Sequence, residues 1–403
     1  MSSSAGNLRH LHGLRALAAL YVVVHHLFIQ ASFQESQVSG PLQRLAGVFG
    51  YGHYAVDFFI ILSGFCLAIP YARETFSSSV QVQSFYKRRA LRILPPYAAA
   101  IAVCLCIIML MGPGPESWWS KSVVRTPWQF WSHVLMVHDL FRDTAWRISP
   151  VLWSISVEWR IYFLFPLLIL CWQRFGGVVA LLVSACCSGM LAAGLYWLGA
   201  RFPEVNTSPT GPCPWYLLLF TLGMLASDIA LSDSKLAVIA RRAPWGALTF
   251  LSALLVFAVP KLKVAIGGVV PWEVLDVCVG LFSVCLLIVS TVSDRGFFGN
   301  VIHGFAGWSP LANLGVFAYS IYLIHTPVLE LVWRYGFAHL HASTAVTAVL
   351  YLVVALPASV VAAYAFFVAF ERPFLSRKIP SKQDNLSNLT NSQLAGKQPS
   401  QSL

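Results

Sequence analysis

The chain has 403 residues, of which 57% are hydrophobic and only 11% are charged, and its formal net charge is +11. A soluble domain carries about 25% charged residues, so this composition excludes an ordinary soluble protein and indicates a polytopic membrane protein. The basic residues stand between apolar segments, which indicates cytoplasmic loops and anionic lipid headgroups as their surroundings rather than nucleic acid. All the cysteines except Cys213 lie inside apolar runs, so we expect neither a disulfide framework nor a metal site.

We expect an all-α polytopic membrane protein with about ten transmembrane helices, each of which needs roughly 20 apolar residues. The expected spans are 12–31, 52–71, 93–112, 151–171, 176–199, 214–231, 245–260, 273–291, 313–334 and 345–370. The first of them is too long for the apolar core of a removable signal peptide. Lys and Arg are more frequent in the loops that face inward if the N-terminus is inside, so the positive-inside rule places both termini in the cytoplasm. The expected domains are a transmembrane domain over 1–374 and a polar, disordered cytoplasmic tail over 375–403.

The first span combines an arginine with two adjacent histidines. A charge at the bilayer centre costs roughly 2.5–3.5 kcal/mol, so such groups normally have a partner or a function. Arg15 and His26 are eleven positions apart, which places both on one face of a helix, about 16 Å apart along its axis. His25 lies on a different stripe. The first span is therefore predicted to turn an Arg/His face into the protein.

The second span contains an acidic residue and a pair of small residues. Ser63-Gly64 permits the close approach of another helix. Asp57 lines a polar pocket in one interpretation, and in the other it caps the helix or lies at the outer interface. The residues alone favour neither.

A basic cluster stands at the cytoplasmic mouth of the third span and comprises Lys87, Arg88, Arg89 and Arg92. Arg88 and Arg92 are four positions apart and are predicted to share a helical face. Guanidinium groups match the geometry of phosphate, so a phosphate-rich cytosolic ligand such as a coenzyme A thioester is one candidate to dock here. On charge alone, a role in topology and in binding anionic lipid is favoured.

The fourth span carries Glu158 and Arg160 well inside its apolar run, with Ser154 and Tyr162 one helical turn before and after the glutamate. A carboxylate there must be paired, hydrogen-bonded or protonated. A structural ion pair with another helix is the alternative to a functional role. We favour function, because the cluster opens towards the same outer side as His26.

The ninth span contains the polar side chains of Ser320, Tyr322 and His325. The sequence His325-Thr326-Pro327 is predicted to break the helix and to expose backbone groups that line a cavity or bind another helix. We expect a structural or pocket-lining role here. Glu371-Arg372, at the inner end of the last span, is interpreted mainly as an end anchor.

Taken together, these stretches resemble acyltransferase family 3, the ten-span membrane O-acyltransferases best known from bacterial cell envelopes. The resemblance runs from about His10 to Phe374, and its motifs occur in the family's order. They are the arginine–ten residues–histidine signature at Arg15 and His26, the block GHYAVDFFIILSGF, the Arg-Arg-x-x-Arg motif from Arg88 to Arg92, the stretch LWSISVEWRIYFLFP around Glu158, a Tyr-Ser-x-Tyr-Leu-x-His-x-Pro element and a Glu-Arg-Pro-Phe element. The chain departs from the family at Trp159 and Arg160, where a second glutamate and a glutamine are frequent.

The resemblance implies transfer of an acyl group, commonly acetyl, from cytoplasmic acyl-CoA to a hydroxyl of a carbohydrate or related acceptor. Histidine has a pKa suited to general-base work, so His26 is expected to act as the base or as a transient acyl carrier. Glu158 would orient or recharge it, and Arg15 would hold phosphates or stabilise developing negative charge. The expected coenzyme A contacts are Lys87, Arg88, Arg89 and Arg92. The expected pocket-lining residues are His25, Asp57, Ser154, Tyr322 and His325.

Two other functions remain open at this point. Spans with buried His, Glu and Arg also suit a proton-coupled transporter, although the chain shows no clear repeat of spans in two halves. A non-enzymatic scaffold leaves the buried charges unexplained. The resemblance further implies a bacterial inner membrane and no metal. Because the soluble hydrolase domain of some family members is not found here, transfer is expected to finish in the membrane domain or with a separate partner enzyme.

Overall fold

The computed structural model describes residues 8–33, 49–72, 79–112, 121–265, 271–292, 295–340 and 344–375. These residues form helices joined by turns, with one isolated β-bridge between Phe141 and Val205. The α-helices of the first half are α1 (Arg9–Phe33), α3 (Gly52–Ala68), α4 (Ser79–Met111), α5 (Pro127–Val134), α6 (Trp153–Phe175) and α7 (Gly177–Arg201). Those of the second half are α8 (Tyr216–Leu231), α9 (Lys235–Ala240), α10 (Trp245–Ala265), α11 (Trp272–Thr291), α12 (Gly296–Ala306), α13 (Ser309–Val316), α14 (Ala318–Val332), α15 (Thr344–Phe366) and α16 (Arg372–Leu375).

Short turns extend several of these helices. Turns of 3-10 type cover Ile69–Ala72 and His138–Leu140, and π-type turns cover Trp333–Phe337 and Phe367–Glu371. Within the described residues, seven helices are long and apolar enough to cross a membrane, or up to eight if the bent pair α13–α14 counts as one span. Helices α8 and α10 are shorter apolar helices. The predicted all-α polytopic membrane fold is confirmed.

Each of the ten expected spans corresponds to one of these helices or to the bent pair. The number of crossings and the side of the termini stay predictions. The domain limits also stay predictions. The tail expected over 375–403 lies, from residue 376 onward, outside the described residues.

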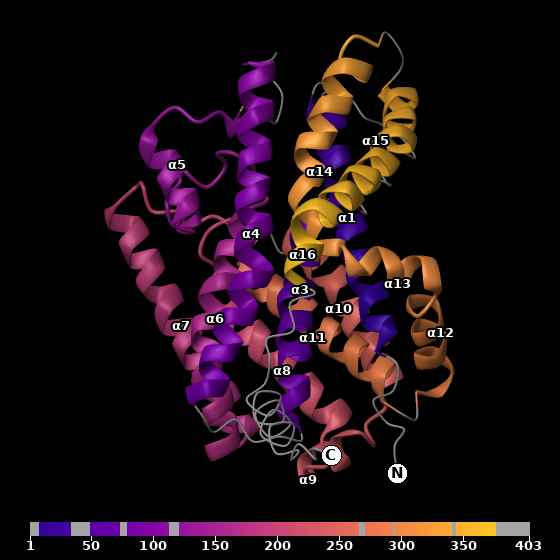
Figure 1. The fold of residues 1–403 in the computed structure, drawn as a ribbon. Helices are drawn as coiled ribbons and strands as arrows, with labels where there is room; N and C mark the ends of the chain where they lie inside the picture. Colours follow the sequence, from indigo (N-terminus) through magenta and orange to yellow (C-terminus); the bar gives the residue numbers. More distant parts are fainter. Residues whose placement is uncertain are drawn as a thin grey trace, which may run out of the picture.

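In the view of Figure 1, α6 and α7 lie on one side of α1, α12 and α13 lie on the other, and α14 and α15 overlap its upper part. Helix α1 packs against α3, α13, α14 and α15, and its buried side chains belong to both hydrophobic clusters of the protein. Arg15, His25 and His26 of α1 are partly buried between helices, whereas His12 is exposed. This placement agrees with the Arg/His face predicted for the first span.

Helices α3 and α8 approach each other through glycines. A Cβ atom built at Gly64 would lie 2.0 Å from the carbonyl oxygen of Phe220, and one built at Gly223 would lie 2.0 Å from that of Ile61. Backbone atoms cannot move aside as a flexible side chain can, so only glycine fits at either position. The close approach predicted at Ser63-Gly64 is confirmed, and small residues at such contacts are typical of membrane helices.

We expect Gly64→Ala to destabilise the protein by about 1–3 kcal/mol, because the added methyl forces α3 and α8 apart. Thermal unfolding of the purified protein in detergent measures this effect. Gly189→Ala is the matched control, since Gly189 lies within α7 and has no neighbouring atom within 4 Å of its built Cβ. That control should be neutral or stabilising by up to about 1 kcal/mol, because alanine favours helix over glycine. Equal melting temperatures for the two variants would contradict the close-packing argument.

The break in the ninth span lies elsewhere than predicted. Helix α14 continues from Ala318 to Val332 through Pro327, whereas the chain bends by 76° between α13 and α14, next to Phe317. The prediction of a break at His325-Thr326-Pro327 is therefore wrong. Proline removes only one backbone hydrogen bond, and neighbouring helices make such a loss tolerable in a membrane helix. His325, Thr326 and Pro327 are all buried against such neighbours.

Candidate functional site

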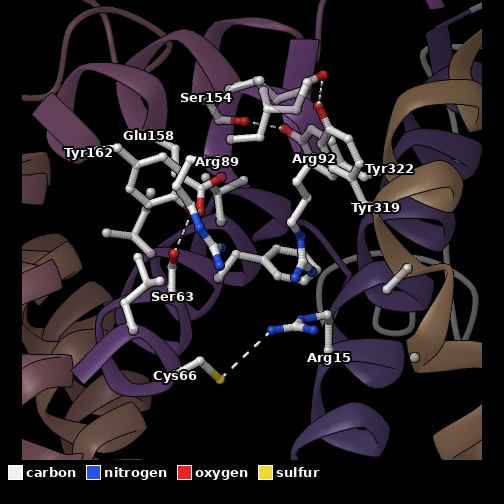
Figure 2. Close-up of a pocket in the computed structure, with 18 of the residues that line it drawn as sticks. Arg15, Ser63, Cys66, Arg89, Arg92, Ser154, Glu158, Tyr162, Tyr319 and Tyr322 are labelled. Atoms are coloured by element: carbon white, nitrogen blue, oxygen red, sulfur yellow. Dashed lines mark hydrogen bonds between the residues drawn. The ribbon is translucent and has the colours of Figure 1, made fainter. Parts of the chain in front are cut away.

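A cavity of about 330 Å³ lies among helices α1, α3, α4, α6, α13 and α14. Its wall combines apolar side chains of α3 with a concentration of polar groups (Figure 2). The polar residues at its wall are Arg15, Ser63, Cys66, Arg89, Arg92, Ser154, Glu158, Tyr162, Tyr319 and Tyr322. They come from segments that are far apart in the sequence, so the fold gathers the stretches that the sequence singled out into one site.

Three arginines give the cavity its electrostatic character. Arg15 comes from α1, and its guanidinium lies 3.8 Å from the sulfur of Cys66. Arg89 and Arg92 come from α4, and the Arg89 guanidinium lies 6.0 Å from the centre of the Tyr162 ring. The buried Nε of Arg89 has no hydrogen-bond partner among the described residues. Several guanidinium groups around one space favour an anionic ligand, above all a phosphate.

The carboxylate in the wall belongs to Glu158. It accepts a short hydrogen bond from the hydroxyl of Tyr162, which lies one turn later on α6. The Ser63 hydroxyl lies 2.7 Å from the same tyrosine oxygen. Because the Tyr162 proton is given to Glu158, the Ser63 hydroxyl acts as the donor to Tyr162. The carboxylate therefore ends a directed chain of hydrogen bonds between α3 and α6.

Arg160 does not share this cavity. It makes a double hydrogen bond and an ion pair with Asp139, a buried carboxylate next to the start of α6. Bidentate geometry of this kind positions a helix firmly. The sequence placed Glu158 and Arg160 in one cluster, and the structure separates them. Positions two apart on a helix point in different directions, which is the physical reason.

A second carboxylate approaches the arginines from the last helices. Glu371 is 1% exposed and accepts a hydrogen bond of 2.5 Å from the hydroxyl of Ser320. Its charge interacts with the guanidinium groups of Arg92 and Arg15. The interpretation of Glu371 as a simple end anchor is therefore wrong, because a buried carboxylate next to two cavity arginines belongs to the surroundings of the site.

His26 lies beside a second histidine. Its Nδ1 is 2.8 Å from Nε2 of His325, and Nδ1 of His325 is 3.0 Å from the carbonyl oxygen of Ile321. A carbonyl can only accept, so Nδ1 of His325 carries the proton. In the neutral pair, Nε2 of His325 is then the acceptor and Nδ1 of His26 is the donor. The basic lone pair of His26 is therefore on its Nε2. This tautomer is inferred from the hydrogen-bond pattern.

The remaining sequence-predicted residues occupy several places. The His25 ring lies 5.0 Å from that of His26, centroid to centroid, but its Nδ1 donates to the carbonyl oxygen of Phe49 at 2.7 Å. Lys87 and Arg88 are exposed on α4 and do not line the cavity. The pair that α4 presents to the cavity is Arg89 with Arg92, rather than the predicted Arg88 with Arg92. Arg89 is three residues before Arg92, so these two side chains lie on the same face of α4.

Two of the predicted pocket residues line the cavity and contact each other. The Ser154 hydroxyl lies 2.7 Å from the hydroxyl of Tyr322, and the Tyr322 hydroxyl donates to the carbonyl oxygen of Val151. The Tyr322 ring is also a neighbour of the His325 ring, with centroids 6.0 Å apart. Tyr322 thus stands between the cavity and the His26–His325 pair, and none of His25, His26, Asp57 and His325 is part of the cavity wall.

Tyr319 is a cavity residue that the sequence argument did not select. It lies one turn before Tyr322 on α14, and its hydroxyl donates to the carbonyl oxygen of Ile93 at 3.4 Å. Tyr319 and Tyr322 are three residues apart and so share one helical face, and this spacing could have indicated Tyr319 as a cavity residue. Fold and site together define a class of protein: a polytopic membrane protein whose interior holds an arginine-rich pocket beside a carboxylate.

Comparison with known families agrees with this class. The family described as an acyltransferase domain (Acyl_transf_3) matches residues 8–368. Because the match covers nearly the whole chain, the protein belongs to the acyltransferase 3 family and is an acyltransferase. The resemblance drawn from the sequence motifs is confirmed.

The chain is similar to two curated relatives that are named as O-acetyltransferases. It is similar to O-acetyltransferase OatA of Staphylococcus aureus (strain NCTC 8325 / PS 47), with 26% identity over 162 residues, covering 40% of this chain and 24% of the relative. It is also similar to YrhL of Bacillus subtilis (strain 168), named as a candidate peptidoglycan O-acetyltransferase, with 25% identity over 339 residues, 80% of this chain and 48% of the relative. The matched region thus spans less than half the length of either relative. No solved structure matches the chain.

Proposed function

We propose that this protein transfers an acetyl group from acetyl-CoA to a hydroxyl of a cell-envelope glycan, within the membrane. The observation that carries the proposal is the cavity in which Arg15, Arg89 and Arg92 surround a space next to Glu158. The family supplies acyl transfer as the reaction class. The names of the two relatives favour acetyl as the group, and one of them names peptidoglycan as the acceptor. The same relatives, both from bacteria, support a bacterial inner membrane as the location in this proposal.

The donor fits the cavity in a particular way. A volume of about 330 Å³ is at the lower end of the range for sites that enclose a drug-sized ligand, and coenzyme A is larger than such ligands. We therefore expect the acetylated arm to enter the cavity, with the phosphates at its arginine-lined part. Arg89 and Arg92 belong to the half of α4 that the positive-inside rule places towards the cytoplasm, where acyl-CoA is available.

In this proposal the acceptor is activated by His26. Because His26 is not part of the cavity wall and Tyr322 lies between them, Tyr322 must move aside for the acceptor hydroxyl to contact both His26 and the thioester. The hydroxyl gives its proton to Nε2 of His26 as its oxygen attacks the thioester carbonyl. The C–S bond then breaks, and the thiolate of coenzyme A takes that proton from the imidazolium. His325 acts as a positioning residue, because its bond to Nδ1 of His26 fixes the tautomer. A variant of the same scheme places the acetyl group on Nε2 of His26 before the acceptor receives it.

Glu158 and Arg15 have electrostatic roles. As the tetrahedral intermediate forms, its oxygen gains negative charge, which a nearby guanidinium stabilises best in a site of low dielectric. Arg15 is suited to this role because it reaches the cavity from α1, the helix that also carries His26. Glu158 offsets part of the positive charge when the donor is absent and orients the reacting groups through the Tyr162–Ser63 chain.

An assay of acetyl transfer tests the proposal. The purified protein is reconstituted in vesicles with acetyl-CoA outside and with peptidoglycan fragments as acceptor, and free coenzyme A and acetylated glycan are both measured. We expect release of coenzyme A that is faster with the acceptor than without it. Glu158→Gln should lower the rate by roughly 10²-fold or more, the scale seen for a lost catalytic group. A proton-coupled transporter would instead move a solute without consuming the thioester, and this outcome would overturn the proposal.

A further inference from the structure

A second polar cluster lies outside the cavity, where helices α3, α8 and α11 begin. It contains His53 and Asp57 on α3, Tyr216 on α8 and Asp276 on α11. Nε2 of His53 lies 3.1 Å from a carboxylate oxygen of Asp276, 3.7 Å from one of Asp57 and 3.2 Å from the hydroxyl of Tyr216. One imidazole nitrogen thus faces two carboxylates and a phenol.

The two carboxylates are fully buried. Asp57 and Asp276 are both 0% exposed. Among the described residues, both carboxylate oxygens of Asp57 lack a hydrogen-bond partner of normal geometry. The same is true of Oδ1 of Asp276. Besides His53, the Asp57 carboxylate interacts with Asp276 and with the Tyr216 hydroxyl. Two adjacent carboxylates of this kind cannot both stay ionised without a compensating charge, because like charges at short range repel strongly in a medium of low dielectric.

We propose that His53, Asp57 and Asp276 bind a divalent transition-metal ion of the zinc type. A dipositive ion beside neutral imidazole and two carboxylates gives a site without net charge, which suits a membrane interior. An imidazole ligand favours zinc and its neighbours over magnesium and calcium, which prefer oxygen ligands alone. Metal binding moves the imidazole proton to Nδ1, so that the Nε2 lone pair is directed to the ion.

The spacing of the ligand atoms fits one ion. Zinc bonds to nitrogen and oxygen are about 2.0–2.2 Å long, and two ligands in tetrahedral arrangement are then about 3.3 Å apart. The ligating atoms of His53, Asp57 and Asp276 all lie within 4.8 Å of one another, with the separations of 3.1 and 3.7 Å from Nε2 given above. Small side-chain rotations close the remaining gap. The fourth position is left for water or for the Tyr216 hydroxyl.

The surroundings support this assignment. Nε1 of Trp215 donates a 2.7 Å hydrogen bond to Oδ2 of Asp276, and such outer partners typically orient a ligating carboxylate. The His53 ring stacks on Trp153, with an interplanar angle of 8°. The His53 side chain is 15% exposed, which leaves a route for an ion to enter. The site would join three helices, and α3 also supplies Val56, Ile60 and Ser63 to the cavity.

Metal analysis of the full-length protein tests the proposal independently of any transfer reaction. The protein is purified in detergent without chelator, and its metal content is measured by mass spectrometry. We expect about one zinc per chain, since a closed site of three protein ligands binds zinc tightly. Asp57→Asn and Asp276→Asn should each lower the affinity for zinc by more than about tenfold, because the mutation of an outer partner alone typically costs about 10–100-fold in affinity. The zinc that remains after purification should fall with it. Glu273→Gln is the matched control on the same helix, because Glu273 bonds to Tyr196 instead.

A second measurement covers variants that fail to fold. Wild-type protein is treated with EDTA, and its melting temperature is recorded before and after the addition of Zn²⁺ alone. We expect the melting temperature to fall with EDTA and to recover with Zn²⁺ in the wild type and in Glu273→Gln. Wild-type protein that contains no stoichiometric metal and does not respond to Zn²⁺ would overturn the proposal. The two carboxylates would then share a proton. Loss of metal in Glu273→Gln as well would also overturn it, since the zinc would then lie elsewhere.

Discussion

His26→Ala should abolish acceptor acetylation, with a fall in rate of about 10²–10⁴-fold, the range typical for a lost general base. The reason is the direction of the hydrogen bonds in the histidine pair: Nδ1 of His26 is bound to His325, so Nε2 is the basic nitrogen. The measurement is acetyl transfer from labelled acetyl-CoA to glycan in membranes. The amount of each variant in the membrane is determined by immunoblot, so that the rates can be expressed per molecule.

His25→Ala is the matched control for this experiment. His25 is adjacent in sequence, equal in chemistry and also on α1, but its Nδ1 donates to the carbonyl oxygen of Phe49 at the start of the next segment. Its loss should weaken the packing of that segment and reduce the rate only modestly. If His26→Ala is as active as His25→Ala, His26 is neither the base nor an acyl carrier.

Arg89→Ala should raise the KM for acetyl-CoA about tenfold to a hundredfold, which corresponds to roughly 1.5–3 kcal/mol for a hydrogen bond to a charged group. The guanidinium of Arg89 lies in the cavity wall and its buried Nε has no partner among the described residues, so it is available to an anionic donor. Initial rates over a range of acetyl-CoA concentrations give the KM. The effect should shrink at high salt, because ions screen the guanidinium–phosphate attraction.

Arg88→Ala separates this local role from the charge of the whole cluster. Arg88 is the neighbouring residue and carries the same charge, but it is exposed and outside the cavity wall. Its replacement removes one positive charge from the cytoplasmic end of α4 and should leave the KM nearly unchanged. Equal shifts in KM for Arg88→Ala and Arg89→Ala would mean that the basic cluster acts through surface potential or lipid binding. That role is the one favoured by the charge of the cluster alone.

The sequence predicted the helices and most of the polar cavity residues for a simple reason. Length and hydropathy determine where a span lies, and an ionisable side chain inside a span must turn inward. Arg15, Glu158 and Tyr322 were selected in this way, and all three line the cavity. The same reasoning could not choose between Arg88 and Arg89, because both stand at the end of an apolar run where either face is compatible with the bilayer.

The sequence could not predict which side chains contact each other across different helices. The contact between His26 and His325 joins residues 299 positions apart, and that between His53 and Asp276 joins residues 223 positions apart. Nothing local marks such pairs, since they depend on which helices pack together. The break at Phe317 was missed for a related reason: proline marks a weak point in a helix, but packing determines whether the helix bends there.

The bend between α13 and α14 has a consequence for the fate of the acetyl group. Residues on both sides of it, Gly315 and Val316 on α13 and Ala318 and Tyr319 on α14, line the cavity. The first N–H groups of a helix have no partner inside that helix, and in a hydrocarbon environment each unsatisfied group costs several kcal/mol. These N–H groups and the polar side chains of the wall favour water in the cavity when no donor is bound. Hydrolysis of the thioester then competes with transfer, so the yield of acetylated glycan depends on how completely the incoming donor displaces that water.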